Sequence, residues 1–432
     1  MKTTTALKAF AIAILHSAFY ILHFTAQGAV IQQVIVRQQW PWSTDVKVEY
    51  KLAEVTAPVD ISVKAFNGET ELPLPAEAVS GDLYGVSESG IGQFIIDPVK
   101  AFGNTKVAIA DFRVELELSE SSASTTEVLY RIYDMSDTTK SPYPYEDIRR
   151  ADFLNGKYGA YETSFANIGS GYTTSLSNVL IWTGVTNCPG AKTTKLVLRK
   201  IPAKDVTWRM GASGGSIGEN ATMVHDCTLK NDYFIGVFEL TQEQYRRLAR
   251  NSYSGSSFAG DANPVNAAML SVFRTGIVEK NSYNFSDGFE LDFPTEAQWE
   301  YACRAGTTAE LYTGQWLSTA NLDPIAWDSA NSASAAHEVG MKLPNAFGLY
   351  DMIGNVYEAC SDNWSDTKPA GYIDGAAVTD PTGSPEPDES GRLVIRGGCF
   401  SVNNFYCTSA GRNKGNGGWN ACGLRVCGRL FK

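Results

Sequence analysis

Short segments rich in β-branched residues, each about one strand long, occupy the first third of the chain. Gly, Pro, Ser and Asp cluster between them and supply turns. Several of the segments alternate in part between apolar and polar side chains, which is typical of half-buried strands. They cover residues 30–36, 46–50, 59–66, 107–118 and 128–132. This pattern predicts an immunoglobulin-like β-sandwich domain over residues 29–145.

Size and charge restrict the rest of the chain. With 432 residues, the chain is long enough for two or three domains. Apolar residues make up 44% and charged residues 19%, which is the balance of a globular protein. The formal net charge is −11, and no run of Lys and Arg interrupts it. An acidic surface repels phosphate backbones, so no nucleic-acid partner is expected.

The N-terminus has the features of a secretory signal peptide. Lys2 and Lys8 precede an apolar stretch over residues 9–24, and small residues follow up to Gly28. The alternative is an uncleaved anchor, but the stretch is short for a membrane span and contains two histidines. We predict a signal peptide over residues 1–28, no membrane span after cleavage, and a secreted, cell-surface or periplasmic location.

Export changes the interpretation of the eight cysteines. An even number of cysteines in an oxidising compartment favours disulfides, and no Cys-x-x-Cys pair is present. The mature chain would keep two histidines, His225 and His337, which argues against a histidine-rich metal centre. The cysteines are Cys188, Cys227, Cys303, Cys360, Cys399, Cys407, Cys422 and Cys427.

Residues 146–195 are rich in Tyr, Gly, Ser and Asn and are interpreted as an ordered connector. A β-branched run at 195–199 then predicts the strand that opens a second domain, residues 196–432. Two helices are expected in this domain. Thr241 with Gln244, and Thr295 with Gln298, form capping boxes at the start of helices over residues 242–250 and 296–304. The whole chain is therefore expected to be α+β.

A series of motifs follows in a fixed order through this second domain. Arg396-Gly397-Gly398 and Gly423-Leu424-Arg425 come late in the series, after longer motifs. Together the motifs resemble the formylglycine-generating enzyme (sulfatase-modifying factor) family, which implies a variant of the C-type lectin fold. The other motifs cover residues 208–211, 233–245, 293–306, 343–358 and 409–412.

The resemblance implies a calcium site. In the family, two side chains and two backbone carbonyls of one loop bind calcium. The matching side chains are Asp351 and Glu358, and the matching carbonyls belong to Gly354 and Val356. Oxygen ligands of this kind suit calcium. The alternative is that the two carboxylates accept hydrogen bonds from loop amides.

The resemblance also implies a disulfide between Cys303 and Cys407, matching a helix cysteine and the cysteine of a family Cys-Ala-Ala-Arg motif. The bridge would close a loop of about a hundred residues, and closing a loop of this length stabilises the folded state by about 4–5 kcal/mol in chain-entropy models. Two more bridges could form among four other cysteines, in a connectivity that the sequence does not determine: Cys360, Cys399, Cys422 and Cys427.

The family's catalytic pair is not matched. The enzymes oxidise a substrate cysteine to formylglycine with copper(I), which two cysteines hold just after a Gly-Gly-Ser. Thiolates are the soft ligands that copper(I) prefers. Here Val402 stands at the first of these positions, and Cys399 replaces the serine. Copper is therefore not expected. An oxidoreductase with a Cys399–Cys407 pair as its catalytic residues remains the alternative function.

The last segment is typical of a binding surface. Residues 400–420 combine Asn, Ser, Tyr, Phe, Trp and Gly, as antibody-like surfaces do. The segment also resembles the variable region of diversity-generating retroelement proteins, although an ordinary polar loop fits equally. We expect an exported binding or adhesion protein with a protein or glycan ligand. Its candidate ligand-binding residues are Phe400, Ser401, Asn403, Asn404, Phe405, Tyr406, Asn413, Asn416, Trp419 and Asn420.

Overall fold

The computed structural model divides the chain into two compact units. One contains residues up to 128 together with 149–159, and the other contains 129–148 and 160–432. The predicted signal peptide lies almost entirely outside the residues that the structure describes. Those residues are 25–26, 28–38, 43–103, 109, 111–212, 224–253, 256–267, 269–286, 288–365, 377–386 and 388–430.

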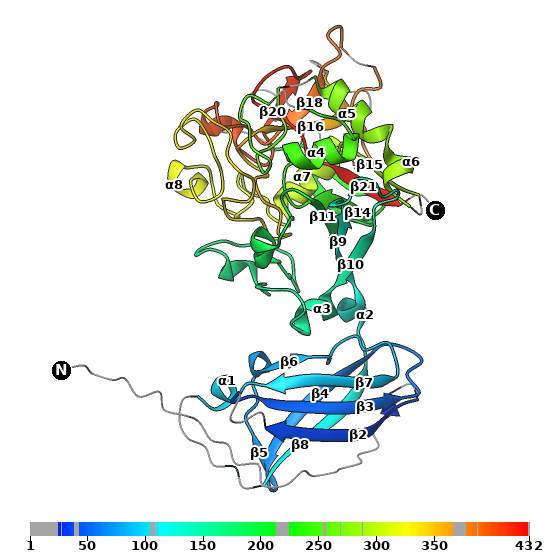
Figure 1. The fold of residues 1–432 in the computed structure, drawn as a ribbon. Helices are drawn as coiled ribbons and strands as arrows, with labels where there is room; N and C mark the ends of the chain where they lie inside the picture. The colour runs from blue at the N-terminus through cyan, green and yellow to red at the C-terminus, as the bar shows by residue number, and fades with distance from the viewer. Residues whose placement is uncertain are drawn as a thin grey trace, which may run out of the picture. The chain divides into compact units, whose positions relative to one another are not determined.

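Two antiparallel sheets form the first unit (Figure 1). One has the order β1-β2-β3-β7-β6, with strands Thr25–Ala26, Ala29–Gln38, Val46–Ala53, Gly90–Ile96 and Val79–Gly81. The other has the order β5-β4-β8, with strands Thr70–Leu72, Val59–Asn67 and Phe112–Glu120. Short helical segments connect them: η1 (Ala76–Ala78), α1 (Pro98–Phe102), α2 (Ala123–Thr126) and α3 (Arg150–Leu154).

Alternation of side chains places the core of this unit between its two sheets. Along β3, Val46, Val48, Tyr50 and Leu52 are buried, and the residues between them face outward. Apolar residues of β2, β4, β7 and β8 join them in one cluster. The first unit is therefore a β-sandwich, as the period-two pattern predicts.

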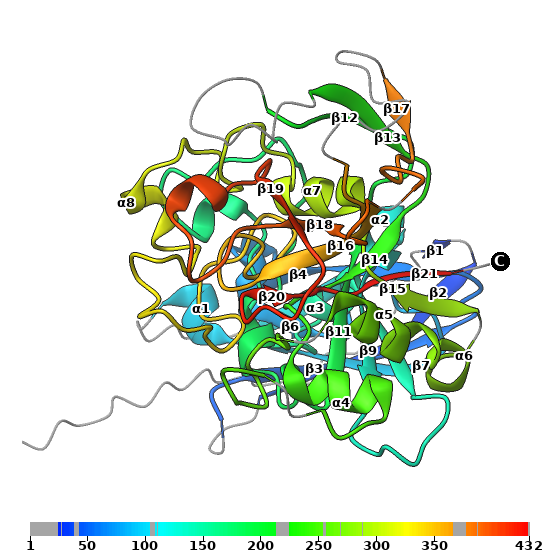
Figure 2. The same ribbon diagram turned by 90° about the horizontal axis from the view of Figure 1, so that it is seen from above.

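Three sheets form the second unit (Figure 2). A six-stranded sheet has the order β10-β9-β11-β14-β21-β15, with strands Tyr145–Arg149, Val128–Asp134, Lys195–Ile201, Tyr233–Gly236, Cys427–Leu430 and Phe289–Asp292. A second has the order β12-β13-β17, with strands Val206–Met210, His225–Leu229 and Val378–Thr379. The third has the order β19-β18-β16-β20, with strands Arg412–Gly415, Leu393–Arg396, Tyr357–Asn363 and Cys422–Gly423.

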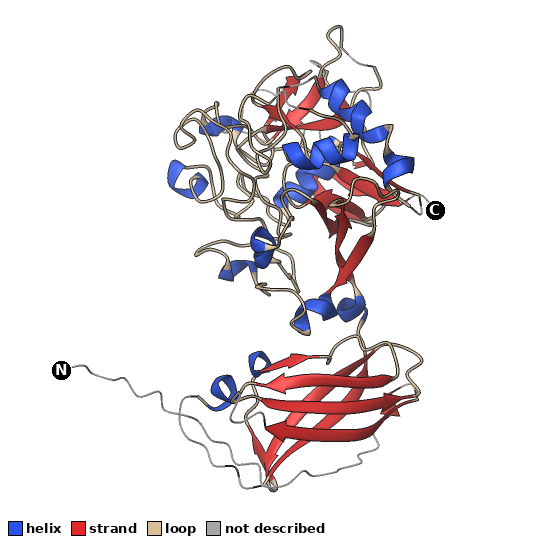
Figure 3. Ribbon diagram, viewed as in Figure 1, coloured by secondary structure: helices blue, strands red, loops and turns tan. Residues whose placement is uncertain are grey.

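Helices are short in this unit, and much of the chain between them is loop (Figure 3). Both predicted capping boxes form, at Thr241 for α4 and at Thr295 for α7. Each hydroxyl satisfies an amide that the first helical turn leaves free. The elements are α4 (Gln242–Ala249), α5 (Leu270–Val278), α6 (Asn281–Asn284), α7 (Glu296–Arg304), α8 (Thr319–Leu322), η2 (Phe165–Asn167), η3 (Thr183–Asn187) and η4 (Asn404–Tyr406).

The structure places the boundary between the units differently from the sequence prediction. Strand β9 was assigned to the sandwich, but it pairs with β11, where Arg131 lies opposite Leu198. Its residues are buried in the second unit's sheet, so they belong to that core. The predicted connector, residues 146–195, is also divided. Helix α3 belongs to the first unit, while Phe165 and Ile181 pack into the core of the second.

The described part of the chain combines sheets with a few helices, and its fold class is α+β as predicted. Within that part, no helix has both the length and the apolar character needed to cross a membrane.

Candidate functional site

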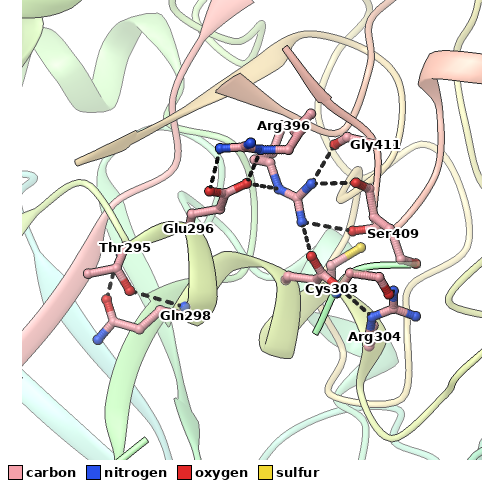
Figure 4. A network of polar contacts seen from close by, with 12 residues as sticks. Thr295, Glu296, Gln298, Cys303, Arg304, Arg396, Ser409 and Gly411 are labelled. Atoms are coloured by element: carbon pink, nitrogen blue, oxygen red, sulfur yellow. Dashed lines mark hydrogen bonds and ion pairs between the residues drawn. The ribbon is translucent and has the colours of Figure 1, made fainter. Parts of the chain in front are cut away.

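A buried ionic network joins helix α7 to strands β18 and β19 (Figure 4). Glu296 and Glu300 lie one turn apart on α7. Arg412 donates to both oxygens of Glu296, at 2.7 and 2.9 Å. Glu300 accepts from Arg304 at 2.8 Å and from Arg396. Burial alone would raise the pKa of Glu300, but the two guanidinium groups outweigh it and lower that pKa.

Arg396 also fixes the segment between the candidate surface loop and β19. Its guanidinium donates to the carbonyls of Ala410 and Gly411, both at 2.7 Å, and to that of Ser409 at 3.2 Å. The side chain is fully buried. Because charged donors make the stronger hydrogen bonds, Arg396 holds residues 409–411 in place from the buried side.

The loop over residues 399–407 has a buried base. Phe400 is buried: its N–H donates to the Asn355 carbonyl at 2.7 Å, and its ring packs on Phe258 with centroids 5.1 Å apart. Its predicted place on the ligand-binding surface is therefore wrong, since the apolar ring fills the core. Cys399 and Cys407 are buried as well.

The other predicted surface residues are exposed or half-exposed, and three of them gather around Tyr357. The Trp419 ring stacks on Tyr357 with centroids 6.0 Å apart and an angle of 17°. The Asn413 amide donates to the Tyr357 hydroxyl at 3.3 Å. Tyr406 is close enough to Tyr357 to contribute to the raised pKa of its hydroxyl. Tyr357 itself is buried. The exposed or half-exposed residues are Ser401, Asn403, Asn404, Phe405, Tyr406, Asn413, Asn416, Trp419 and Asn420.

Sequence reasoning missed two members of this surface. Tyr357 precedes Glu358 in a family motif, but nothing in the motif shows which strand lies over it. Met269 comes from a distant part of the chain. Met269 forms an isolated antiparallel β-bridge with Gly417, and the N–H of the next residue, Leu270, donates to the Asn416 carbonyl at 3.0 Å. The Met269 side chain is exposed. No local pattern predicts a contact between segments this far apart.

The predicted calcium ligand Glu358 has other partners. Arg425 donates to both of its oxygens at distances between 2.6 and 3.0 Å. The Trp299 indole donates to the same carboxylate at 2.6 Å. All three side chains are buried. A guanidinium therefore occupies the position beside this carboxylate that a cation would need.

Asp351, the other predicted side-chain ligand, accepts from the Gly340 N–H at 2.6 Å. Its second oxygen is buried with no hydrogen-bond partner among the described residues. Burial, with a smaller effect of the Glu358 charge, raises the pKa of Asp351 to about 6. Nearby Glu239 accepts from the Val356 N–H at 3.0 Å, and burial and the Asp351 charge raise its pKa.

These contacts do not fit the calcium site that the resemblance implies. One of its two carboxylates is engaged by Arg425, and a divalent cation placed there would face a buried positive charge. The alternative interpretation, carboxylates that bind loop donors, agrees with the geometry of Asp351.

The eight cysteines are free thiols in the structure. Cys303 points its thiol toward the Met352 carbonyl, 3.9 Å away, and is not bridged to Cys407. The Cys303–Cys407 disulfide thus stays a prediction. Burial raises the pKa of the Cys399 and Cys407 thiols, which disfavours the thiolate forms that copper(I) and covalent chemistry require.

Asp362 supports the start of α7. It accepts from the Glu296 N–H at 2.8 Å, and its other oxygen is buried without a hydrogen-bond partner in the described residues. Burial, followed by the Glu296 charge, raises the pKa of Asp362 to about 7. The carboxyl is therefore protonated over much of the acidic range.

Residues 204–430 match the family described as the Sulfatase-modifying factor enzyme 1-like domain. This match covers more than half of the chain, and the chain belongs to that family.

Individual relatives are more distant. A formylglycine-generating enzyme of Streptomyces coelicolor is 33% identical over 126 residues, which cover 26% of this chain and 37% of that enzyme. A chaperone protein of Paenibacillus barcinonensis is 25% identical over 247 residues, or 45% of this chain and 80% of the relative. Among solved structures, Treponema denticola variable protein 1 is 25% identical with a TM-score of 0.44, over 54% of this chain and 95% of its own.

We expect calcium to leave the melting temperature unchanged. Glu358 is already paired with Arg425, so a divalent cation at the family-implied position would meet that buried guanidinium. Thermal unfolding in millimolar calcium and in EGTA measures this. A melting temperature that rises with calcium, and no longer does so in Asp351→Asn, would instead establish the predicted site.

Asp362→Asn should change the pH dependence of stability. The folded pKa of about 7 lies above the unfolded value of about 3.9, so ionisation is disfavoured in the folded state. The stabilisation from the protonated group is complete below about pH 4 and is lost as pH rises through about 7. Relative to wild type, the variant should gain on the order of 2–4 kcal/mol between about pH 4 and pH 8.

Urea unfolding at several pH values tests this change. Asp226→Asn is the matched control, because the Asp226 side chain is half exposed. It should follow the wild-type pH profile. Parallel profiles for wild type and Asp362→Asn would show that Asp362 ionises normally.

Proposed function

We propose that this chain is an exported binding protein whose family domain binds a protein or glycan ligand at the Tyr357 surface. We define this surface as Tyr406, Asn413 and Trp419 around Tyr357, together with the neighbouring Met269, Ser401, Asn403, Asn404, Phe405, Asn416 and Asn420. Export rests on the predicted signal peptide.

One observation supports the proposal above all: large aromatic side chains stand exposed over a buried support. Phe405, Tyr406 and Trp419 are 48%, 43% and 44% exposed. Exposed aromatic side chains grouped with amides suit recognition, because rings supply contact area at little entropic cost and amides supply adaptable hydrogen bonds. Asn403 also accepts from the Phe405 N–H at 3.2 Å, which caps η4 and holds the backbone that carries the exposed ring.

The buried support favours binding over oxidation. Cys399 and Cys407 lie beneath the exposed side chains rather than among them. A substrate cysteine would have to displace the loop to reach either sulfur. The domain's core thus holds the loop in place, while its outer side chains are free to contact a ligand.

Alanine at Trp419 should abolish or greatly weaken ligand binding. The change removes the ring that stacks on Tyr357, and truncating an aromatic anchor at the centre of an interface commonly costs about 2 kcal/mol or more, a loss of roughly thirtyfold in affinity. A glycan array and a displayed peptide library identify a ligand for the wild type, and calorimetry then compares the variants.

Trp316→Ala is the matched control, since Trp316 is 73% exposed and lies outside the Tyr357 surface. It should bind as wild type does. Equal losses in both variants, or none in Trp419→Ala, would place the binding surface elsewhere.

The alternative, a formylglycine-generating oxidoreductase, draws on the closeness of Cys399 to Cys407. It requires tight stoichiometric copper(I) binding. We expect an anaerobic copper(I) titration to show no such binding, because the burial that raises both thiol pKa values disfavours thiolates. Tight binding that is lost in Cys399→Ser would support the enzyme instead.

A further inference from the structure

Cys407 lies against the backbone of Gly398 and Cys399. Its sulfur is 2.6 Å from the position that a Cβ on Gly398 would occupy, and its Cα is 3.0 Å from that position. Gly398 has a φ of +77°, so a side chain is excluded there by space and by conformation. Because Gly398 directly precedes Cys399, the Cys407 sulfur also lies near the Cys399 backbone. The Cys399 sulfur lies 3.3 Å from the Ser401 hydroxyl, so it must turn from that hydroxyl toward Cys407 before the two sulfurs can pair.

Two other buried cysteines, Cys303 and Cys422, have different immediate neighbours. Cys303 points its thiol toward the Met352 carbonyl and lies next to Ser409. The Cys422 sulfur packs 3.4 Å from the position of a Cβ on Gly415. Cys399 lies close enough to both Cys407 and Cys422 to act on each thiol electrostatically, but only the Cys407 sulfur packs against Gly398, the residue before Cys399. Proximity thus favours Cys399 over the family-implied Cys303 as the partner of Cys407.

We propose that Cys399 and Cys407 form a disulfide that closes the loop carrying Phe405 and Tyr406. The oxidant is a disulfide such as oxidised glutathione. One cysteine thiolate attacks a sulfur of the donor and releases one thiol. The second cysteine then displaces the donor's other half from the mixed disulfide. Two electrons pass to the donor, which leaves as two thiols that take up the two protons.

Burial determines when the bridge forms. Both sulfurs are inaccessible in the folded domain, so exchange takes place during folding or local opening. Once closed, the bridge is shielded from external thiols, and reduction should be slow without denaturant.

The closed loop spans nine residues, from Cys399 to Cys407, and includes η4. Fastening both ends reduces the conformations open to the exposed rings, and preorganisation of this kind strengthens binding. The consequence for binding rests on the proposed function, whereas the bridge itself does not.

Peptide mapping tests the bridge directly. Protein folded in a glutathione redox buffer is alkylated under denaturing conditions and digested with trypsin without reduction. Cys399 and Cys407 fall in one tryptic peptide, residues 397–412, while Cys303 lies in 281–304 and Cys422 in 415–425. We expect peptide 397–412 to be unalkylated and two hydrogens lighter than its reduced form. Alkylation at both positions, or a link from Cys407 to either other peptide, overturns the proposal.

A pair of variants separates the bridge from general effects on folding. Cys399→Ser should leave Cys407 alkylated, lower the melting temperature by several degrees, and speed amide exchange over residues 400–406 at least tenfold. Cys422→Ser, another buried cysteine, should keep the bridge and slow exchange. Equal exchange in both variants and wild type would show that no bridge restrains the loop.

The two proposals can fail separately. A bridged protein that binds no glycan or peptide refutes the binding function alone, and an unbridged protein that binds refutes the disulfide alone.

Discussion

The contact between Arg396 and Glu300 determines how the rest of the family domain is arranged. Both side chains are buried, and Arg396 also holds the carbonyls of residues 409–411. Loss of either partner would leave an uncompensated charge in the core, which commonly costs 3–5 kcal/mol. Helix α7, strand β18 and the chain leading into β19 are therefore fixed relative to one another. The loop over residues 399–407 begins and ends on these fixed elements. The contact between Arg396 and Glu300 therefore also determines where the exposed residues of the loop lie.

A second buried pair, Arg425 with Glu358, has a similar role beside the first. It joins the segment before β21 to β16, and Arg425 further donates to the Gly236 and Tyr350 carbonyls at 2.8 and 2.7 Å. In a family whose resemblance implies calcium at Glu358, this domain uses an internal guanidinium as the counter-charge. The two charge pairs hold the irregular loops in place through side chains of the chain itself. The stability of the domain and the positions of its loops thus depend on buried residues, and the exposed side chains contribute little to either.

The sequence predicted local features well and distant ones poorly. The capping boxes at Thr241 and Thr295 form because each depends on residues three positions apart. The sandwich follows from alternation within single strands. By contrast, strand β9 was assigned to the wrong unit, because its pattern shows that it is a strand but not which strand it pairs with. Phe400 was mistaken for a surface residue because composition does not distinguish a ring that packs on Phe258 from one that faces solvent. Tyr357 and Met269 needed the tertiary fold to be recognised.

Tyr357 has a consequence for how this domain could change over generations. Its ring supports Trp419 and its hydroxyl binds Asn413, yet it is itself part of the core. The support and the supported residues are therefore different positions of the chain. Substitutions among the outer residues alter the chemistry offered to a ligand while the platform beneath them is inherited intact. Such a division allows the outer side chains to change at little cost to folding, because the buried residues that hold the domain together stay the same.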